Sequence, residues 1–385
     1  MFFSINKTRL DNFPFYHVHQ SLVINLDDGW ECTHDRHNNL IYYKGYLDSD
    51  TLSTRVLEIA EQEEPLFFGN FCIIKCFDKG ISFKTDRLRS FPIWYDKEYG
   101  LTNLVPQSHT CWTDSFVTIT DSLELVESKF SLLGQFESSE LDKTQVIEKV
   151  DQILTNKISQ FADKNHLPIK IFLSGGIDTM LLYSYFLKLK IPHQLIDYNH
   201  IDFDYFYLKN HGTLSKFWGY KQIHHWKENC ILVTGAPGDE FTVRSPITAN
   251  MILQYHRLNI IDLLDQYRGC LHYTHFNNPK YFRFWEQHRS LEYESLSQSI
   301  KNCLNLNLND WQHWHLGKTL SYTPLRDTRL FVLIARLKKD QLVQQVMNSV
   351  IQKEIIQRNA PQLLNSLSDQ KNSENSMQNL TNLMC

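Results

Sequence analysis

Lys-Ile-Phe-Leu-Ser-Gly-Gly-Ile-Asp-Thr, residues 170–179, joins a short apolar run to a glycine-rich turn. The run at 171–173 predicts a buried strand, and the apolar segment that begins at Met180 predicts a helix. The turn between them is an expected anion site, because backbone N–H groups and the helix dipole both point toward it. Gly175 and Gly176 would allow a phosphate to come close to the backbone.

The remaining side chains of this loop indicate a phosphate that is bound together with a metal ion. Ser174 and Thr179 add hydroxyl donors. Asp178 would repel a bare phosphate, so its position suggests a bridging Mg²⁺. The alternative is an ordinary strand-to-helix turn with a capping aspartate. The loop has neither the Gly-Lys-Ser/Thr ending of a Walker loop nor the Gly-x-Gly-x-x-Gly pattern of a dinucleotide turn.

Composition limits the class of protein. A length of 385 residues with 42% hydrophobic side chains predicts two or three globular domains. The net charge of −4 offers no basic surface for long nucleic acid. Eight cysteines without a Cys-x-x-Cys pair indicate reduced thiols rather than disulfides or a zinc site. With no 18-residue apolar run and no signal pattern at the start, we expect a cytoplasmic protein without a membrane segment.

Residues 1–130 have the pattern of a β-rich region. Short apolar or aromatic runs recur at 21–26, 40–43, 66–77, 81–84, 94–95 and 116–119. The polar turns at 27–29 and 78–80 are expected to be hairpin turns. A short helix is predicted at 52–62.

The second half of the chain alternates between helical and strand patterns. After a polar linker at 133–143, apolar residues between Val146 and Phe161 follow helical spacing. Strands are predicted at 191–198, 221–226 and 230–234, and a helix at 203–217. Such alternation predicts a mainly parallel sheet, which binds ligands at the carboxyl ends of its strands. Helices are predicted at 246–268, 281–304, 308–316, 327–337 and 339–358, and the last 25 residues are expected to be loosely ordered.

Two further stretches repeat or extend the first motif. Residues 231–240, Ile-Leu-Val-Thr-Gly-Ala-Pro-Gly-Asp-Glu, again run from an apolar strand into a glycine-rich turn. We expect Asp178 and Asp239 to converge at one edge of the sheet with divalent metal between them. A surface turn with a solvated Asp-Glu pair is the alternative. At 322–330, Asp327 can cap the helix that follows Pro324.

These three stretches, in this order, resemble the synthetase domain of the asparagine synthetase family. The first resembles the pyrophosphate (PP) loop, Ser-Gly-Gly-x-Asp-Ser/Thr, of the ATP pyrophosphatase superfamily. Gly235, Gly238, Asp239 and Glu240 resemble the second family motif, and Pro324, Leu325 and Asp327 the third. In the N-terminal half, residues 69–71 and 85–87, Pro92 and Trp94-Tyr95 resemble the family's N-terminal-nucleophile (Ntn) glutaminase domain.

The resemblance implies an α/β fold with two domains. Residues 1–140 would form an Ntn-hydrolase-like αβ sandwich, a degenerate glutamine amidotransferase domain. Residues 141–385 would form a PP-loop ATP pyrophosphatase domain, a parallel α/β domain of the adenine nucleotide α-hydrolase type with a helical C-terminal part.

The chain departs from the family at residues that carry chemistry. Phe2 and Phe3 stand where the family's glutaminase carries its nucleophilic Cys, so no thioester with glutamine can form. Ala236-Pro237 replaces Glu-Gly in the second loop. Leu320 stands where asparagine synthetases carry a Glu, and Ala236 where β-lactam synthetases carry a Tyr. Neither relative's residue for activating the amine is therefore present.

The expected function is that of an ATP- and Mg²⁺-dependent ligase that forms amide bonds. A carboxylate would be adenylated with release of pyrophosphate, and an amine would then displace AMP. The substrates would be small molecules or peptides, including a precursor peptide. The resemblance implies catalytic roles for Asp239, Glu240 and Lys371, metal binding by Asp178 and Asp239, and ATP binding by Leu173, Ser174, Gly175, Gly176, Asp178, Thr179 and Gly235.

Several alternatives remain open. The chain could be a non-catalytic relative that binds a nucleotide or a partner protein, or a PP-loop enzyme that modifies a nucleotide or RNA. Lys371 lies in a polar tail, where a solvated lysine is the alternative. The 17 histidines include the pairs His224-His225 and His313–His315, which lack a partnered metal-ligand spacing and are interpreted as core or surface side chains.

Overall fold

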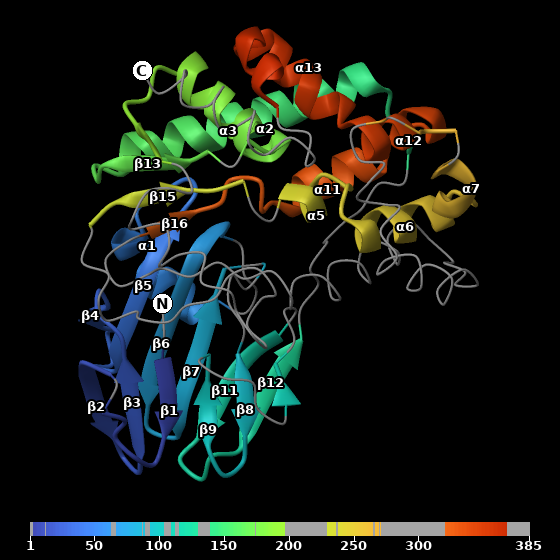
Figure 1. The fold of residues 1–385 in the computed structure, drawn as a ribbon. Coiled ribbons are helices and arrows are strands. Elements are labelled where there is room, and N and C mark those ends of the chain that lie inside the picture. Colours follow the sequence, from blue (N-terminus) through green and yellow to red (C-terminus); the bar gives the residue numbers. More distant parts are fainter. Residues whose placement is uncertain are drawn as a thin grey trace.

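The computed structural model describes most of both halves of the chain. The described residues are 3–11, 13–62, 67–86, 88, 93–103, 109–111, 115–129, 139–173, 175–196, 229–235, 238–264, 266–268, 270 and 320–367. Figure 1 shows antiparallel strands in one half and helices around a parallel sheet in the other. The chain is therefore a mixed α/β protein, as predicted. Among the described helices, none has both the length and the apolar character that a membrane crossing requires.

The N-terminal half contains two antiparallel sheets of six strands each. The first has the order β10 (His109–Thr110), β8 (Trp94–Asp96), β9 (Gly100–Thr102), β1 (Phe3–Asn6), β3 (Leu22–Leu26) and β2 (Phe15–His19). The second has the order β12 (Leu125–Lys129), β11 (Ser115–Thr120), β7 (Gly80–Thr85), β6 (Gly69–Phe77), β5 (Leu40–Leu47) and β4 (Glu31–His34).

The two sheets pack face to face around one apolar core. Phe3 and Ile24 of the first sheet share this core with Ile74 and Phe83 of the second. The rings of Phe3 and Phe83 lie 5.1 Å apart, centroid to centroid. Helix α1 (Leu52–Glu61) covers the outer face of the second sheet with a separate apolar cluster. Its position confirms the helix predicted at 52–62.

One of the two predicted hairpin turns is wrong. The turn at 78–80 does join adjacent strands, since Phe77 pairs with Gly80. The turn at 27–29 instead connects β3 of the first sheet to β4 of the second. The residue pattern of a sharp turn is the same in both cases, so sequence alone did not distinguish a hairpin from a crossover between sheets.

The second half is built on a parallel sheet with the order β14 (Gln194–Ile196), β13 (Ile169–Phe172), β15 (Ile231–Val233) and β16 (Leu320–Tyr322). Each neighbouring pair is parallel, which confirms the predicted arrangement for these strands. Helix α2 (Lys143–Lys164) precedes the sheet and begins with a capping box between Asp142 and Gln145. It starts inside the linker expected at 133–143, and Leu141 pairs with Leu337.

Helices cover this sheet on the side away from the N-terminal half (Figure 1). They are α2, α3 (Ile177–Lys188) and α13 (Val350–Asn359), which contact one another. The remaining described helices are α5 (Gly238–Phe241), α6 (Pro246–Tyr255), α7 (Ile260–Leu264), α11 (Thr328–Ala335), α12 (Lys339–Asn348) and the 3₁₀ helix η2 (Pro361–Ser366). The segments predicted at 203–217, 221–226, 281–304 and 308–316 lie outside the described residues.

Two predicted helices are each divided in two, and residues 361–367, the described part of the last 25 residues, are better packed than expected. The backbone takes positive φ at Arg257, beyond α6, and at Ser349, between α12 and α13. A left-handed residue ends a helix by turning the chain out of its axis. Residues 361–385 were expected to be loosely ordered, but η2 is regular and the Leu363 side chain is completely buried.

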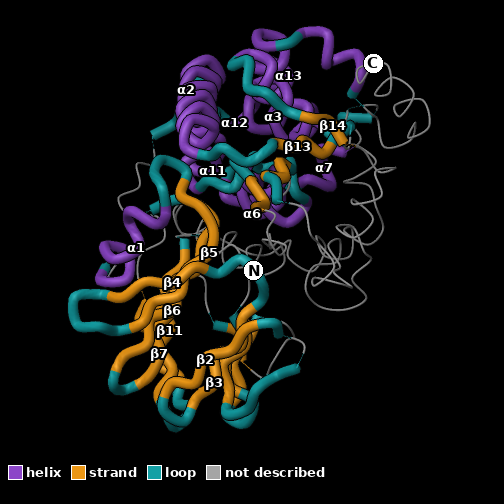
Figure 2. The backbone as a smooth tube through the Cα atoms, turned by 90° about the vertical axis from the view of Figure 1, so that its left-hand side faces the viewer, coloured by secondary structure: helices purple, strands orange, loops and turns teal. Residues whose placement is uncertain are grey.

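The two halves meet at a buried contact surface. Tyr46, at the end of β5, packs edge-on against Phe161 and Tyr322, which stack at 3.6 Å. Lys157 of α2 pairs with Asp48 at 2.9 Å and with Asp327 at 3.4 Å. Figure 2, turned by 90°, shows α1 and the end of β5 reaching toward the helical half.

Candidate functional site

The best candidate site lies where the parallel sheet changes direction. From β13 the chain proceeds to β14 on one side, whereas β15 and β16 follow on the other side. At such a switch point the loops after two adjacent strands diverge and leave a crevice at their carboxyl ends. The loops that follow β13 and β15 are the two glycine-rich loops of the sequence.

The first loop has the geometry expected of an anion-binding turn. Leu173 extends β13, since its N–H donates to the Ile196 carbonyl at 2.9 Å. Gly175 has φ of 76°, which favours glycine. Gly176 is the N-cap of α3 and, having no side chain, supplies no side-chain cap. Asp178 and the buried Thr179 lie in the first turn of α3, where N–H groups lack intrahelical partners.

The second loop is pressed against the first at its two glycines. A Cβ atom on Gly235 would lie 2.7 Å from the Thr179 nitrogen. A Cβ atom on Gly238 would lie 2.5 Å from the Asp178 carboxyl carbon. Contacts this short do not occur for real side chains, so both positions require glycine for the loops to approach. The Gly238 N–H also donates to the Gly235 carbonyl at 2.7 Å, which closes the turn.

Arg244 joins the two acidic side chains that the loops bring together. Its Nη2 pairs with an Asp178 carboxylate oxygen and lies 2.5 Å from an Asp239 carboxylate oxygen. The Arg244 side chain is only 2% exposed. Its Nε donates to the Thr242 hydroxyl and its Nη1 to the Ser349 hydroxyl, each at 3.0 Å. The guanidinium is therefore fixed between the two carboxylates rather than extended into solvent.

Helix α13 supports the same cluster from the far end of the chain. Gln352 donates from Nε2 to the second Asp178 oxygen at 3.4 Å. The Gln352 side-chain oxygen accepts from Gln345 at 2.8 Å. The left-handed turn at Ser349 places these helices so that the Ser349 hydroxyl and the Gln352 amide both reach the cluster.

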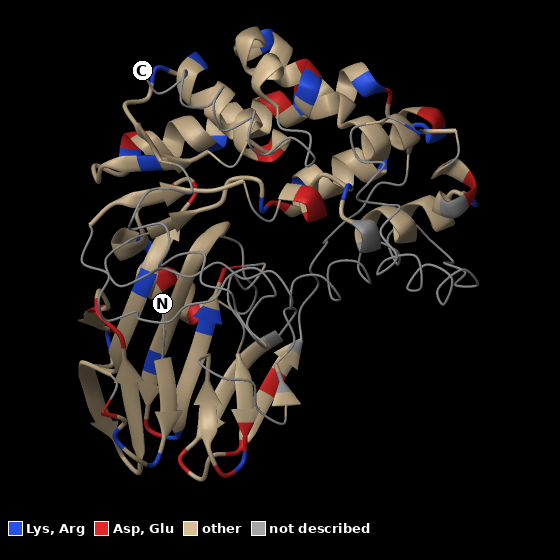
Figure 3. Ribbon diagram, viewed as in Figure 1, with Lys and Arg blue, Asp and Glu red and all other residues tan. Residues whose placement is uncertain are grey.

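The charges of this cluster do not balance. Asp178, Asp239 and Glu240 contribute three carboxylates, and Arg244 is the one cation among these four side chains. Burial, only partly offset by Arg244 and increased by Asp239, raises the pKa of Asp178. Burial, followed by the Asp239 charge, raises the pKa of Glu240 well above its usual value. Figure 3 shows the acidic first turn of α5 as red ribbon. Among the described residues, the site thus holds more acidic than basic side chains, and a bound cation would favour the ionised form of its carboxyl groups.

The structure brings together most of the residues that the sequence singled out. Two of them, Ser174 and Lys371, lie outside the described residues, as do Ala236 and Pro237. Those placed at the site are Leu173, Gly175, Gly176, Asp178, Thr179, Gly235, Asp239 and Glu240.

Asp327 is not part of this cluster. As predicted, it caps α11 by accepting from the Arg329 N–H at 2.9 Å. Its buried carboxylate also pairs with Lys157. The third sequence motif therefore contributes to the contact between the two halves of the chain.

Sequence reasoning missed Arg244, Ser349 and Gln352. A usable signal was present, because Gln345, Ser349 and Gln352 follow each other at helical spacing and all are buried. Buried polar side chains need partners in the interior, so such a row in the sequence marks a buried polar network.

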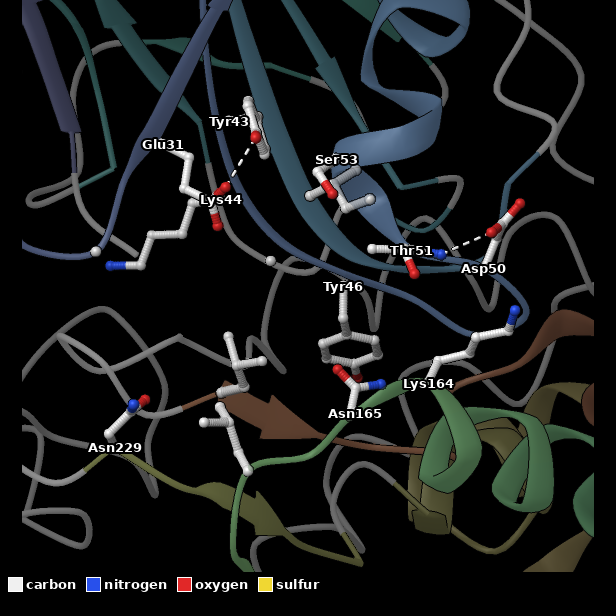
Figure 4. Close-up of a pocket in the computed structure, with 15 residues that line it drawn as sticks. Glu31, Tyr43, Lys44, Tyr46, Asp50, Thr51, Ser53, Lys164, Asn165 and Asn229 are labelled. Atoms are coloured by element: carbon white, nitrogen blue, oxygen red, sulfur yellow. Dashed lines mark hydrogen bonds between the residues drawn. The ribbon is translucent and has the colours of Figure 1, made fainter.

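A cavity of about 280 Å³ lies elsewhere, between the two halves of the molecule (Figure 4). Its lining includes Lys44 and Tyr43 of β5 and, from the other half, Asn165, Asn229 and Leu320. Asn229 and Leu320 lie at the amino ends of β15 and β16, whereas the acidic cluster lies at the carboxyl ends. We place the candidate site at the cluster because the converging loops and the excess of acidic side chains are there.

No protein-family model and no curated protein matches the chain. Weak likenesses exist to solved structures. One is the glutamine phosphoribosylpyrophosphate amidotransferase from B. subtilis complexed with ADP and GMP, at 9% identity and a TM-score of 0.24, with 60% of this chain and 63% of that chain covered. Another is the allosteric regulatory enzyme of purine biosynthesis, at 9% identity and a TM-score of 0.22, with 55% and 60% covered. The chain thus spans about three-fifths of the length of each.

Proposed function

We propose that this chain is an ATP-dependent ligase that adenylates a carboxylate and transfers the acyl group to an amine. In this proposal residues 1–140 are a degenerate Ntn-type domain and residues 141–385 a PP-loop domain similar to that of asparagine synthetases. One observation carries the proposal: two glycine-rich loops meet at the switch point between β13 and β15 and bring Asp178 and Asp239 onto one guanidinium. Backbone donors, close approach of the backbone and paired carboxylates are features that suit a metal-bound triphosphate.

The residues present fit a bound Mg²⁺ by their chemistry. Carboxylate oxygens are the ligands that Mg²⁺ prefers, and the described cluster holds three carboxyl groups and one guanidinium. Asp178 and Asp239 would hold the ion, and it would neutralise charge on the phosphates of ATP. Arg244 already bridges the two carboxylates, so it would remain beside them as a second, fixed positive charge.

The proposed chemistry uses backbone and side-chain groups of the two loops and one lysine of the C-terminal residues. The substrate carboxylate attacks the α-phosphorus of ATP, the bond between the α- and β-phosphates breaks, and pyrophosphate leaves. Backbone N–H groups of residues 175–177 and the hydroxyls of Ser174 and Thr179 bind the pyrophosphate. The amine then attacks the acyl carbon, AMP leaves, and the amine loses one proton. Lys371 is proposed to offset charge on the α-phosphorus, and Glu240 to act within the acidic cluster.

The experiment that tests this proposal separates binding from chemistry. The full chain is titrated with α,β-methylene-ATP and Mg²⁺, and exchange of labelled pyrophosphate into ATP is then measured with a panel of amino acids and short peptides. We expect binding, and exchange with at least one carboxylate. Failure to bind the analogue would contradict the proposal.

Variants of the acidic pair make the test specific. Asp178→Asn and Asp239→Asn should each lower exchange by about a hundredfold or more while the fold stays intact. Asp151→Asn is the matched control, because Asp151 is another ion-paired helix aspartate, bonded to Lys188 at 3.1 Å and remote from the cluster. Equal losses in Asp151→Asn and Asp178→Asn would show a general effect on folding.

A second candidate is a non-catalytic relative that binds a nucleotide. The observation that favours it is Arg244, whose buried guanidinium already occupies the space between the two carboxylates. Binding of the analogue in wild type, without exchange for any member of the panel, is the result that this candidate predicts.

A further inference from the structure

Strand β2, at the edge of the first sheet, carries two half-buried histidines between exposed apolar and aromatic side chains. His17 and His19 both point toward the second sheet. The His17 ring lies 5.8 Å from the ring of Tyr42, and the His19 Nε2 lies 3.0 Å from the Phe77 carbonyl oxygen. Two imidazoles thus face the second sheet from one edge strand.

A thiol meets these imidazoles from the other sheet. Cys76 of β6 is 2% exposed and belongs to the core between the sheets. One ligand atom each of His17, His19 and Cys76 lies within 4.8 Å of the other two. No disulfide joins any of the described cysteines, so the Cys76 sulfur is not committed to another covalent bond.

We propose that His17, His19 and Cys76 form a zinc site that joins the two antiparallel sheets. Two imidazole nitrogens and one thiolate are ligands that Zn²⁺ prefers, and three protein ligands leave the fourth position of a tetrahedron to water. Zinc distances to nitrogen and sulfur of about 2.0–2.3 Å require the ligand atoms to come within about 4 Å of one another.

The hydrogen bond of His19 orients its ring for this role. A carbonyl oxygen only accepts, so the Nε2 that faces Phe77 carries the proton. In neutral imidazole the lone pair then lies on Nδ1, which is the nitrogen left to bind a cation. Metal-bound histidines regularly donate their other N–H to a carbonyl in this way.

The Cys76 sulfur binds zinc as a thiolate, so zinc binding releases the thiol proton to solvent.

A second group of three side chains at the other edge of the sandwich provides an internal control. His109, Cys111 and Glu127 also lie within 4.8 Å of one another. Here, however, the His109 Nε2 is already bonded to the Glu127 carboxylate at 2.9 Å. An imidazole and a carboxylate that satisfy each other have less need of a metal, so we assign no zinc to this group.

The test uses the chelator-treated full chain and Zn²⁺. Bound zinc is measured after equilibrium dialysis, and Co²⁺ is added separately to detect thiolate-to-metal charge-transfer absorption. Wild type should bind one zinc and show the thiolate band. Cys76→Ser and His19→Gln should weaken binding by about a hundredfold or more. Circular dichroism of each zinc-free variant checks that it is folded.

Cys111→Ser is the matched control, since it removes another buried thiol from the same core. It should keep wild-type zinc affinity and the charge-transfer band. Zinc affinity within a few fold of wild type in folded Cys76→Ser would overturn the proposal. Loss of zinc in Cys111→Ser with retention in Cys76→Ser would move the site to the other edge and equally overturn it.

Discussion

Lys157 and Arg244 each lie buried between two aspartates, but the two clusters differ in charge balance. Around Lys157, the carboxylates of Asp48 and Asp327 face two cations, because Arg329 also bonds to Asp327 at 2.5 Å. Burial raises the pKa of Asp327, but Lys157 and Arg329 outweigh it and hold that pKa below its usual value. Two cations thus face two carboxyl groups, although burial still raises the pKa of Asp48, and the cluster joins the two halves of the chain.

The described cluster around Arg244 has fewer cations than carboxyl groups. Asp178, Asp239 and Glu240 share one guanidinium, and the pKa of Asp178 is raised by burial despite that neighbour. The Asp239 side chain is 47% exposed, whereas Asp327 is completely buried. A balanced, closed ion cluster stabilises a contact, while an unbalanced cluster that opens to solvent retains the capacity to bind a cationic or metal-bound ligand.

The largest expected effect is on the balanced cluster. Lys157→Met keeps the length of the side chain but leaves two buried carboxylates without their shared cation. We expect the free energy of unfolding in urea to fall by about 3–5 kcal/mol. Lys188→Met is the matched control, because Lys188 pairs with Asp151 on the surface and should lose about 1 kcal/mol or less. Similar losses in both variants would remove the distinction between a structural and a surface ion pair.

Arg244→Gln is the corresponding change in the unbalanced cluster. It leaves three carboxylates close together, so the melting temperature should fall and Mg²⁺ should restore it more than in wild type. Arg329→Gln is the control, because it removes an arginine from the balanced cluster, where Lys157 remains. Thermal unfolding with and without MgCl₂ measures the difference. An equal response of both variants to Mg²⁺ would contradict the inference that a bound cation favours the ionised carboxyl groups of the Arg244 cluster.

The parts of the site that sequence predicted are those with local signals. The strand before Ser174 and the glycines of both loops depend on residues that are neighbours in the chain, as does the cap at Asp327 outside the site. Arg244 meets Asp178 across 66 positions and Gln352 meets it across 174, and no periodic pattern encodes such pairs. Cys76 is likewise distant in sequence from His17 and His19, and it meets them only because the two sheets pack together. Long-range partners follow from tertiary packing, and one sequence shows them only as polar residues in unexpected positions.

A smaller effect on stability is expected from the C-terminal residues, where Lys371 is proposed to offset charge on the α-phosphorus of ATP. Truncation after Leu367 should abolish pyrophosphate exchange and change the melting temperature little. Truncation after Pro361 should also destabilise the fold by about 2–5 kcal/mol, because it removes the fully buried Leu363. Lys371→Ala in the full chain separates the charge from the rest of the segment. Full exchange activity of Lys371→Ala would show that this lysine is an ordinary solvated side chain.

For the N-terminal half of the chain we expect no measurable glutaminase activity. Phe3 begins β1 with its side chain completely buried, and its N–H donates to the Asn103 side chain at 2.8 Å. Its ring packs against Phe83 and against Trp30, in the interior between the two sheets. In the proposed Ntn-type domain a glutaminase would need a nucleophile such as a thiol at the start of β1, and the Phe3 ring is not a nucleophile.

We therefore expect no glutamate release when the full chain is incubated with glutamine, with or without ATP and Mg²⁺. The matched variant is Phe3→Leu, which keeps an apolar side chain in the core and should behave like wild type. A heat-inactivated sample gives the background of spontaneous hydrolysis. Glutamate release well above that background in wild type would mean that another group of the sandwich acts as the nucleophile. The N-terminal half would then contribute chemistry to the reaction, whereas the proposal places all reacting groups in the second half.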